Sequence, residues 1–265
     1  MKAIFSALII LIAFRANAVT VEDMVLVPDE RHPFYINIFE VSDLMFYKVS
    51  KIRRYKEQVD NWPTKVVSPE EAEAYCKGLG LRVPTLDEWM TAATNLGQNK
   101  NYSVIGDHYQ DAAGKKTFNW DGGDSVPVDD VRAGIDSIGT VGMSGNRSEW
   151  VIDSRGNYLQ CGGDYKIRHP KTYHFNTICG GSNTVIFSST HRATVRCVID
   201  YSPDIQVTYS ARVKGQIKEN LDRLSQNTNP ILENGEGQQR IPDGNQNSQK
   251  PSDPKANKKD DDRFD

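Results

Sequence analysis

The sequence predicts an α+β domain with short mixed strands, two or three helices and much irregular loop. Three observations support this class. β-prone runs lie near the start, two later segments carry helix-capping signals, and a long stretch rich in Asn, Gly and Asp follows them. The 265 residues suit one domain of ordinary size with additional segments at its ends.

The first segment, residues 1–18, has the pattern of a secretory signal peptide. Lys2 provides the positive charge, residues 3–14 are apolar, and Ala16-Asn17-Ala18 is a typical cleavage site. The apolar run is short for a membrane span, although an uncleaved anchor is the alternative. We therefore expect a bacterial-type exported protein, periplasmic or secreted, that starts at Val19 and has no membrane span after cleavage.

Charge and cysteine content narrow the partners and the compartment. The formal net charge is −3, which argues against nucleic acid or an anionic membrane as the partner. The cysteines have no zinc-ligand or C-x-x-C spacing, and an even number in an exported chain predicts two disulfides with three alternative pairings. They are Cys76, Cys161, Cys179 and Cys197.

Two short strands and a helix are expected at the start of the domain. Residues 24–28 are β-prone, and residues 33–42 place Phe34, Ile36 and Ile38 at two-residue spacing. Residues 43–54 are expected to form a helix.

Capping signals mark the next two helices. Ser68 with Glu71 and Thr85 with Glu88 each form a capping box, and Pro69 suits the first helical position. Glycines should end them, at positions 80 and 97. We expect Arg82 to pair with Glu88 and Trp89 to lie in the core. The apolar faces are Ala72, Tyr75, Cys76 and Leu79 in the first helix, and Trp89, Ala92, Ala93 and Leu96 in the second.

A glycine-rich stretch follows at residues 139–150. Gly139, Gly142 and Gly145 lie within seven residues, which disfavours a helix or a strand interior because each glycine loses much conformational entropy on ordering. The stretch therefore predicts a tight loop that ends on Glu149 and Trp150.

The order G-x-x-G-M-x-G-N-x-x-E-W in this loop resembles the core loop of the formylglycine-generating enzyme family, also called the sulfatase-modifying-factor domain. The helix pair, with its A-Y-C and R-x-P-T-x-x-E-W segments, resembles the same family, as do the opening strands and two segments near Cys179 and Cys197. These five motifs follow in the family's order over residues 24–200. The resemblance implies a C-type-lectin-like fold for residues 19–203.

The resemblance also implies disulfides and a metal site. It implies the pairs Cys76–Cys197 and Cys161–Cys179. It further implies a structural calcium near the core loop, held through Asn146 and Glu149. Two departures weaken the calcium expectation: Gly142 stands where the family often has Asn or Asp, and Arg147-Ser148 replaces a Val-Trp pair.

Catalytic members of this family bind copper through two cysteines located before the terminal strand. The corresponding interval, residues 183–196, contains no cysteine. Thiolates select Cu(I), and hydroxyls such as those of Ser188 and Ser189 do not replace them. We therefore expect a non-catalytic member and assign no catalytic residue.

The function that we expect is an exported binding module that recognises a protein or glycan partner. Aromatic and short polar side chains in two loop segments make a candidate binding surface. The alternative is that many of these aromatic residues belong to the core. The candidate residues are Tyr102, Tyr109, Trp120, Tyr165, His169, Tyr173 and His174.

Two other functions stay open. One is a copper- or thiol-dependent oxidase or modifying enzyme in which Cys161 and Cys179 form a reactive pair. The other is a structural envelope protein with a polar tail as its tether. Residues 204–226 predict a short amphipathic helix, and residues 227–265 have too few apolar residues to fold, which predicts disorder.

Overall fold

A computed structural model describes residues 19–53, 60–65, 67–166, 168–175, 179, 193–211 and 213–215. The chain divides into two units, Met1–Lys218 and Glu219–Asp265, and every described residue belongs to the first. The expected signal peptide at residues 1–18 and disordered tail at residues 227–265 lie outside the described residues.

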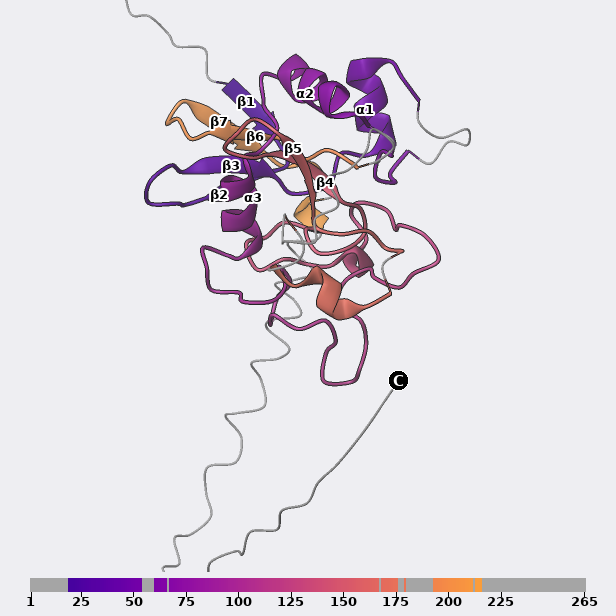
Figure 1. Ribbon diagram of the computed structural model, residues 1–265. Helices are drawn as coiled ribbons and strands as arrows, with labels where there is room; N and C mark the ends of the chain where they lie inside the picture. The colour runs from indigo at the N-terminus through magenta and orange to yellow at the C-terminus, as the bar shows by residue number, and fades with distance from the viewer. Residues whose placement is uncertain are drawn as a thin grey trace, which may run out of the picture. The chain divides into compact units, whose positions relative to one another are not determined.

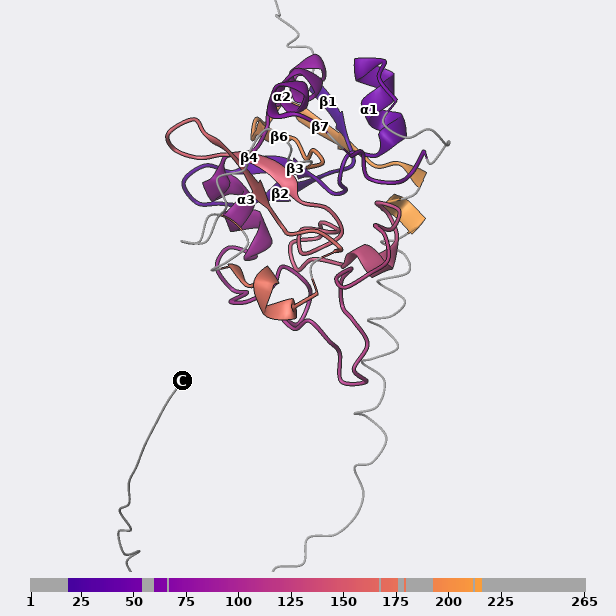
Figure 2. The ribbon, with the colours of Figure 1, turned by 45° about the vertical axis from the view of Figure 1, so that its right-hand side comes forward.

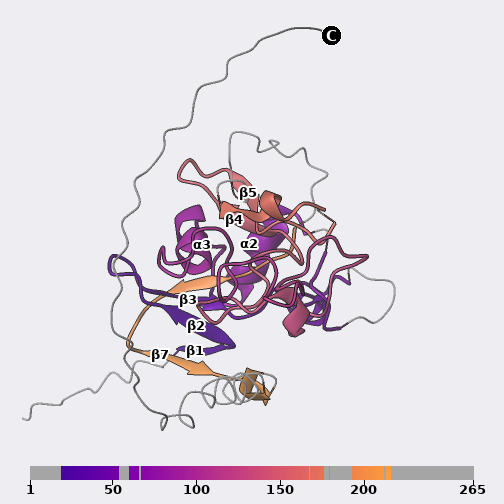
Figure 3. The ribbon, with the colours of Figure 1, turned by 90° about the horizontal axis from the view of Figure 1, so that it is seen from below.

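Three small sheets confirm the predicted α+β class (Figure 1). β3 (Phe34–Asn37) is the central strand of a three-stranded antiparallel sheet, between β2 (Met24–Val27) and β6 (Val198–Asp200). β4 (Glu149–Ile152) and β5 (Tyr158–Cys161) form an antiparallel hairpin. β1 (Val19–Glu22) and β7 (Ile205–Thr208) form a parallel pair, which Figure 3 shows beside β2. Because the strands are short, much of the domain consists of loops.

Three helices start where the capping signals predict. The Ser42 side chain caps α1 (Asp43–Ser50), and complete capping boxes start α2 (Pro69–Gly78) and α3 (Leu86–Ala93). α1 ends earlier than expected because Lys51 adopts a left-handed conformation, with φ of 61°. Two 3₁₀ turns, η1 (Val131–Ala133) and η2 (Pro170–Tyr173), interrupt the loops.

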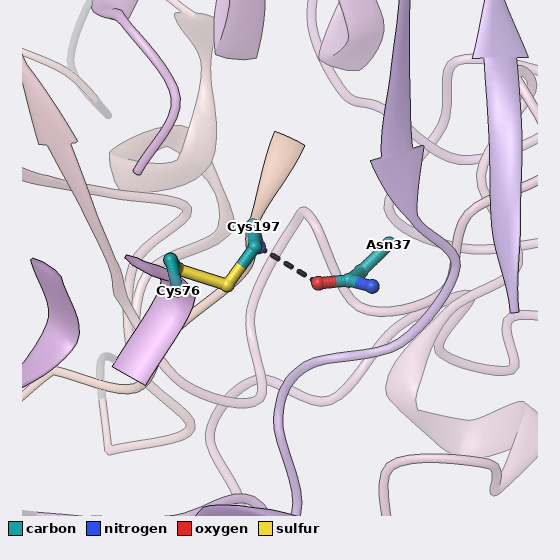
Figure 4. Close-up of a disulfide and its surroundings, with 3 residues drawn as sticks. All are labelled: Asn37, Cys76 and Cys197. Carbon is teal, nitrogen blue, oxygen red and sulfur yellow. Dashed lines mark hydrogen bonds between the residues drawn. A yellow bond between two sulfur atoms is a disulfide. The ribbon is translucent and has the colours of Figure 1, made fainter. Parts of the chain in front are cut away.

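The core forms around α3 as the sequence predicts for Trp89, Ala92 and Ala93, whereas Leu96 lies beyond the end of the helix and is exposed, as is Leu79 after α2. Trp89 is fully buried, and Arg82 donates two hydrogen bonds to Glu88, at 2.7 and 2.5 Å. The structure also joins the two cysteine pairs that the family resemblance implies. The Cys76–Cys197 bridge links α2 to the chain entering β6, and the Cys197 backbone N–H donates to the Asn37 side chain at 2.8 Å (Figure 4).

The structure differs from the sequence prediction after residue 203. Residues 205–208 form a strand where we expected an amphipathic helix to begin, because Ile205 and Val207 alternate with polar residues and pair with β1. Residues 211 and 213–215 are helical, and Val213 belongs to the same buried cluster as Ile38 and Phe39. The rest of the expected helix lies outside the described residues.

The two ends of the domain carry different kinds of structure (Figures 1 and 2). α1 and α2 lie together at one end, and the long loops with η2 lie at the other, with the strands between them. Within the described residues, no helix is long and apolar enough to cross a membrane.

Candidate functional site

The glycine-rich core loop, residues 139–150, lies at the centre of the end of the domain that carries the long loops, which we call the loop end. Every residue from Thr140 to Trp150 is buried. Gly145 has φ of 83°, and a Cβ atom there would lie 2.4 Å from the Asn119 carbonyl oxygen. Glycine is therefore required because two backbone segments meet without space for a side chain.

Asn146 and Arg147 attach this loop to the buried carboxyl of Glu40. The Asn146 side chain donates to Glu40 Oε2 at 2.5 Å, and the Arg147 backbone N–H donates to Oε1 at 3.0 Å. The Asn146 side-chain oxygen accepts from the Val126 backbone at 2.8 Å and from Asn119 at 3.1 Å. Asn146 is thus a structural clamp between the core loop and its neighbours.

Glu149 belongs to a second buried network. Its carboxylate accepts from Trp89 Nε1 at 2.6 Å and from Arg196 at 2.6 and 2.9 Å, and the ion pair is fully buried. The remaining Arg196 donors reach the carbonyl oxygens of Asn37, Ile38 and Val141, each at 2.8 Å. This guanidinium therefore joins the sheet, the core loop and α3.

The interior around Arg196 contains three carboxyl groups, those of Glu149, Glu40 and Asp136. Burial lowers the pKa of Arg196, but the charges of Glu149, Glu40 and Asp136 outweigh that effect, so its pKa is raised. Burial raises the pKa of Glu40 well above its usual value, and the nearby Glu149 adds to the effect. Burial also raises the pKa of Asp136. The network thus favours the neutral forms of Glu40 and Asp136.

The residues named for calcium do not fit a metal site in this arrangement. The oxygens of Asn146 and Glu149 already accept hydrogen bonds, and Arg196 neutralises Glu149. Calcium requires six to eight oxygen ligands, mostly without competing cations. No group of three or more His, Cys, Asp or Glu residues suited to a metal occurs in the part of the chain that the structure describes.

The structure brings together most of the aromatic residues of the predicted surface, but it buries several of them. Tyr102, Trp120 and Tyr173 pack with Phe118 in one cluster, where the Phe118 and Tyr173 ring centroids lie 5.2 Å apart. Tyr165 is also buried. These four residues of the predicted surface therefore serve mainly as support.

The accessible residues lie around this cluster. Tyr109 is 37% exposed, and its ring lies 6.0 Å from those of Tyr102 and Trp120. His174 is half-buried with its ring 4.9 Å from Tyr102, and His169 is exposed just before η2. The surface that a partner can reach is thus narrower than the sequence suggests.

Sequence reasoning missed two residues at this end. The buried side chains of Arg147 and Gln160 each have a nitrogen, Nε and Nε2, without a hydrogen-bond partner, as has Trp120 Nε1. The Arg147 guanidinium lies 5.1 Å from the Tyr165 ring centroid and 3.7 Å from Asp164. The only signal was the Arg147-Ser148 departure from the family's Val-Trp pair.

Backbone hydrogen bonds hold these groups in one place. Asn146 N–H donates to Asn119, and Gly122 N–H donates to Tyr165, each at 2.9 Å, while Tyr165 N–H donates to Asn146 at 3.0 Å. The segments that carry Trp120, Arg147 and Tyr165 are therefore directly connected. We call the resulting surface the loop patch, formed by Tyr109, Trp120, Arg147, Gln160, His169 and His174.

Known structures similar to the chain have low sequence identity to it. Solved structures that resemble the chain include the crystal structure of CarF, at 19% identity over 64% of this chain and 87% of that chain, with a TM-score of 0.41. Another is Treponema denticola variable protein 1, at 13% identity over 67% of this chain and 83% of that chain, also with a TM-score of 0.41. A search of curated proteins finds no match.

The family comparison is decisive for classification. The model of the sulfatase-modifying factor enzyme 1-like domain matches residues 15–201, which is well over half of the chain. The mixed α+β architecture agrees with that match. So does the order along the chain, in which the helices come first, then the core loop and then the terminal strand. The chain therefore belongs to the sulfatase-modifying factor family, with its C-type-lectin-like fold.

Proposed function

We propose that the protein is an exported binding module that recognises a protein or glycan partner through the loop patch. Family membership supplies the scaffold, and the described cysteines are all in disulfides. Loops held on a rigid frame are common recognition surfaces. Tyr109, His169 and His174 would provide the accessible contacts, with the aromatic cluster as their support.

The observation that carries this proposal is the set of unpartnered donors. Trp120, Arg147 and Gln160 each bury a nitrogen without a hydrogen-bond partner. An unsatisfied buried donor costs about 1–3 kcal/mol, so three such donors beside one surface considerably destabilise the free protein. A partner with hydroxyl or carbonyl oxygens would satisfy them, and both glycans and peptide backbones carry such acceptors.

Export is part of the proposal. Two disulfides are typical of proteins that fold in an oxidising compartment such as the periplasm or the extracellular space. The charged, apolar and A-x-A segments of residues 1–18 support the same compartment.

Binding to immobilised glycans and to envelope or surface proteins tests the proposal. Tyr109→Ala combined with His169→Ala should reduce affinity at least about tenfold, because both side chains are accessible. The control is Tyr209→Ala, since Tyr209 is 39% exposed and belongs to the segment after β7. Tyr165 and Tyr173 are unsuitable for this test because their burial makes alanine variants report on folding.

Arg147→Lys tests the donors directly. It keeps the positive charge but removes the Nε donor and the planar guanidinium. We expect a loss of affinity of at least about tenfold with an unfolding midpoint close to wild type. Full affinity in both Arg147→Lys and the Tyr109 and His169 double variant would place the partner elsewhere on the domain.

A further inference from the structure

A cavity of about 230 Å³ lies among β1, the start of α1 and the end of α2, away from the loop patch. Its volume lies below the usual range of about 300–1,000 Å³ for ligand pockets, so it suits only a small ligand. The inner wall is buried, and Thr20, Glu22, Met45 and Leu79 are exposed at its edge. The buried wall includes Met24, Phe39, Glu40, Val41, Tyr75 and Val128.

Every charged residue that lines this cavity is acidic. Glu22, Asp23 and Glu40 contribute to the lining, and no Lys, Arg or His is among the lining residues. Asp23 accepts hydrogen bonds from Ser210, and Glu40 accepts from the core loop. Glu22 makes no ion pair with any described residue. The cavity therefore has an apolar wall, and the charged residues of its lining are all acidic.

The interior next to the cavity also contains several carboxyl groups. Burial and the nearby Glu149 raise the pKa of Glu40, although the charges of the buried Arg196 and Arg147 oppose that shift. Arg196 itself pairs with Glu149. A cation in the cavity would add positive charge beside Glu40.

The apolar lining suits an organic cation better than a hydrated ion. Phe39 and Tyr75 offer aromatic rings, which attract cations through their negative faces. Met24 and Met45 add polarizable thioethers that adapt to a small apolar body. A metal ion would lack the oxygen ligands that it needs in such a wall.

We propose that this cavity binds a small organic cation, with a compact apolar body against Phe39 and Tyr75 and an ammonium group beside Glu40 and Glu22. This site is independent of the partner bound at the loop patch. It adds a small-molecule site to a domain whose proposed function concerns a macromolecule.

Three probes of similar shape and different charge test the site. Benzylammonium, benzyl alcohol and benzoate are titrated separately into the full-length exported protein at pH 7, with binding followed by calorimetry and by the thermal midpoint. We expect saturable one-to-one binding of benzylammonium, at least tenfold weaker binding of benzyl alcohol, and no binding of benzoate.

Matched variants locate the binding. Met45→Trp should fill the mouth of the cavity and abolish benzylammonium binding, whereas Tyr47→Trp on the same helix should not, since both side chains are 37% exposed and only Met45 lines the cavity. Glu22→Gln should weaken binding severalfold, and the exposed Glu30→Gln should leave it unchanged.

Several results would overturn the proposal. These are equal binding of the alcohol and the ammonium, no binding of any probe by the folded wild-type protein, or equal binding by Met45→Trp and Tyr47→Trp. The loop-patch variant Tyr109→Ala should bind benzylammonium normally, since Tyr109 does not line the cavity, so a failure at one site is distinguishable from a failure at the other.

Discussion

Arg196 and Arg147 are both buried, but they are used differently. Arg196 is fully buried, and its hydrogen bonds reach Glu149 and three backbone carbonyls of the frame, which comprises β3, α3 and the core loop. Arg147 has an unpartnered Nε and a carboxylate, that of Asp164, only at 3.7 Å. The comparison separates two uses of a buried guanidinium: the frame satisfies the donors of Arg196, whereas Arg147 at the loop patch has a buried donor without a partner.

Removing either of the two disulfides should cause a large loss of stability, and the two losses should differ. Replacing Cys76 and Cys197 together with Ala should cost about 4–5 kcal/mol of unfolding free energy, because the bridge closes a loop with a sequence separation of 121. Replacing Cys161 and Cys179, with a separation of 18, should cost about 3 kcal/mol. Denaturant unfolding of the oxidised proteins measures both. Equal costs would show that loop closure does not determine the difference.

The two arginines give the next test. Arg196→Met should destabilise the protein by about 3–5 kcal/mol because it leaves Glu149 as a buried charge without its partner. Arg147→Met should cost less than about 1 kcal/mol, since its ion pair is long and one donor is already unsatisfied. Urea unfolding of both variants decides the matter, and similar losses would remove the distinction between frame and patch.

Glycines test the contact between the frame and the loop patch. Gly145→Ala should cost about 2–4 kcal/mol, because the new Cβ would meet the Asn119 carbonyl and the positive φ is unfavourable for alanine. Gly156→Ala is the control: its φ of 82° is nearly the same, but its Cβ would meet no atom within 4 Å. The control should cost only about 1 kcal/mol. Thermal unfolding that shows equal losses would mean that the close contact does not matter.

The dependence of stability on pH should have opposite signs in the two regions. The raised pKa of Glu40 in the frame means that its contribution is present below its ordinary value of 4.5 and is lost as the pH rises. Burial opposes ionisation of Asp107 in the loop end, but the N–H groups of Tyr102, Lys100 and Asn101 lower its pKa. Its contribution is therefore present above 3.8 and lost as the pH falls.

Thermal midpoints measured from about pH 2 to 8 check these signs, because the contribution of Asp107 is lost only below pH 3.8. Relative to wild type, Asp107→Asn should lose less stability on acidification, and Glu40→Gln should lose less on alkalinisation. If both variants lost less stability than wild type on the same side of the pH range, the opposite pKa shifts of Glu40 and Asp107 would be contradicted.

Local signals made part of this structure predictable. The capping boxes at Ser68 and Thr85 and the core position of Trp89 depend on neighbouring residues, and the structure confirms them. The strand at Ile205 was missed because its stability depends on pairing with distant Val19. The helical spacing of apolar residues from Val213 onward predicts a helix. This local pattern carries no information about the pairing of β7 with β1.

The candidate site was harder to predict for a related reason. Aromatic residues suit both cores and binding surfaces, so the composition of the loops could not show that Tyr173 is buried and Tyr109 is accessible. The donors of Arg147 and Gln160 lack partners only because of how distant loops meet. Such a property has no signature in a single sequence.

The pairing of β1 with β7 has a consequence for the order of events during biosynthesis. Chains are synthesised from the N-terminus, so β1 is made long before β7, and Cys76 long before Cys197. Neither the strand pair nor the Cys76–Cys197 bridge can form until about residue 208 has been made. The domain therefore completes its fold late in synthesis, and β1 has an open edge until β7 is available.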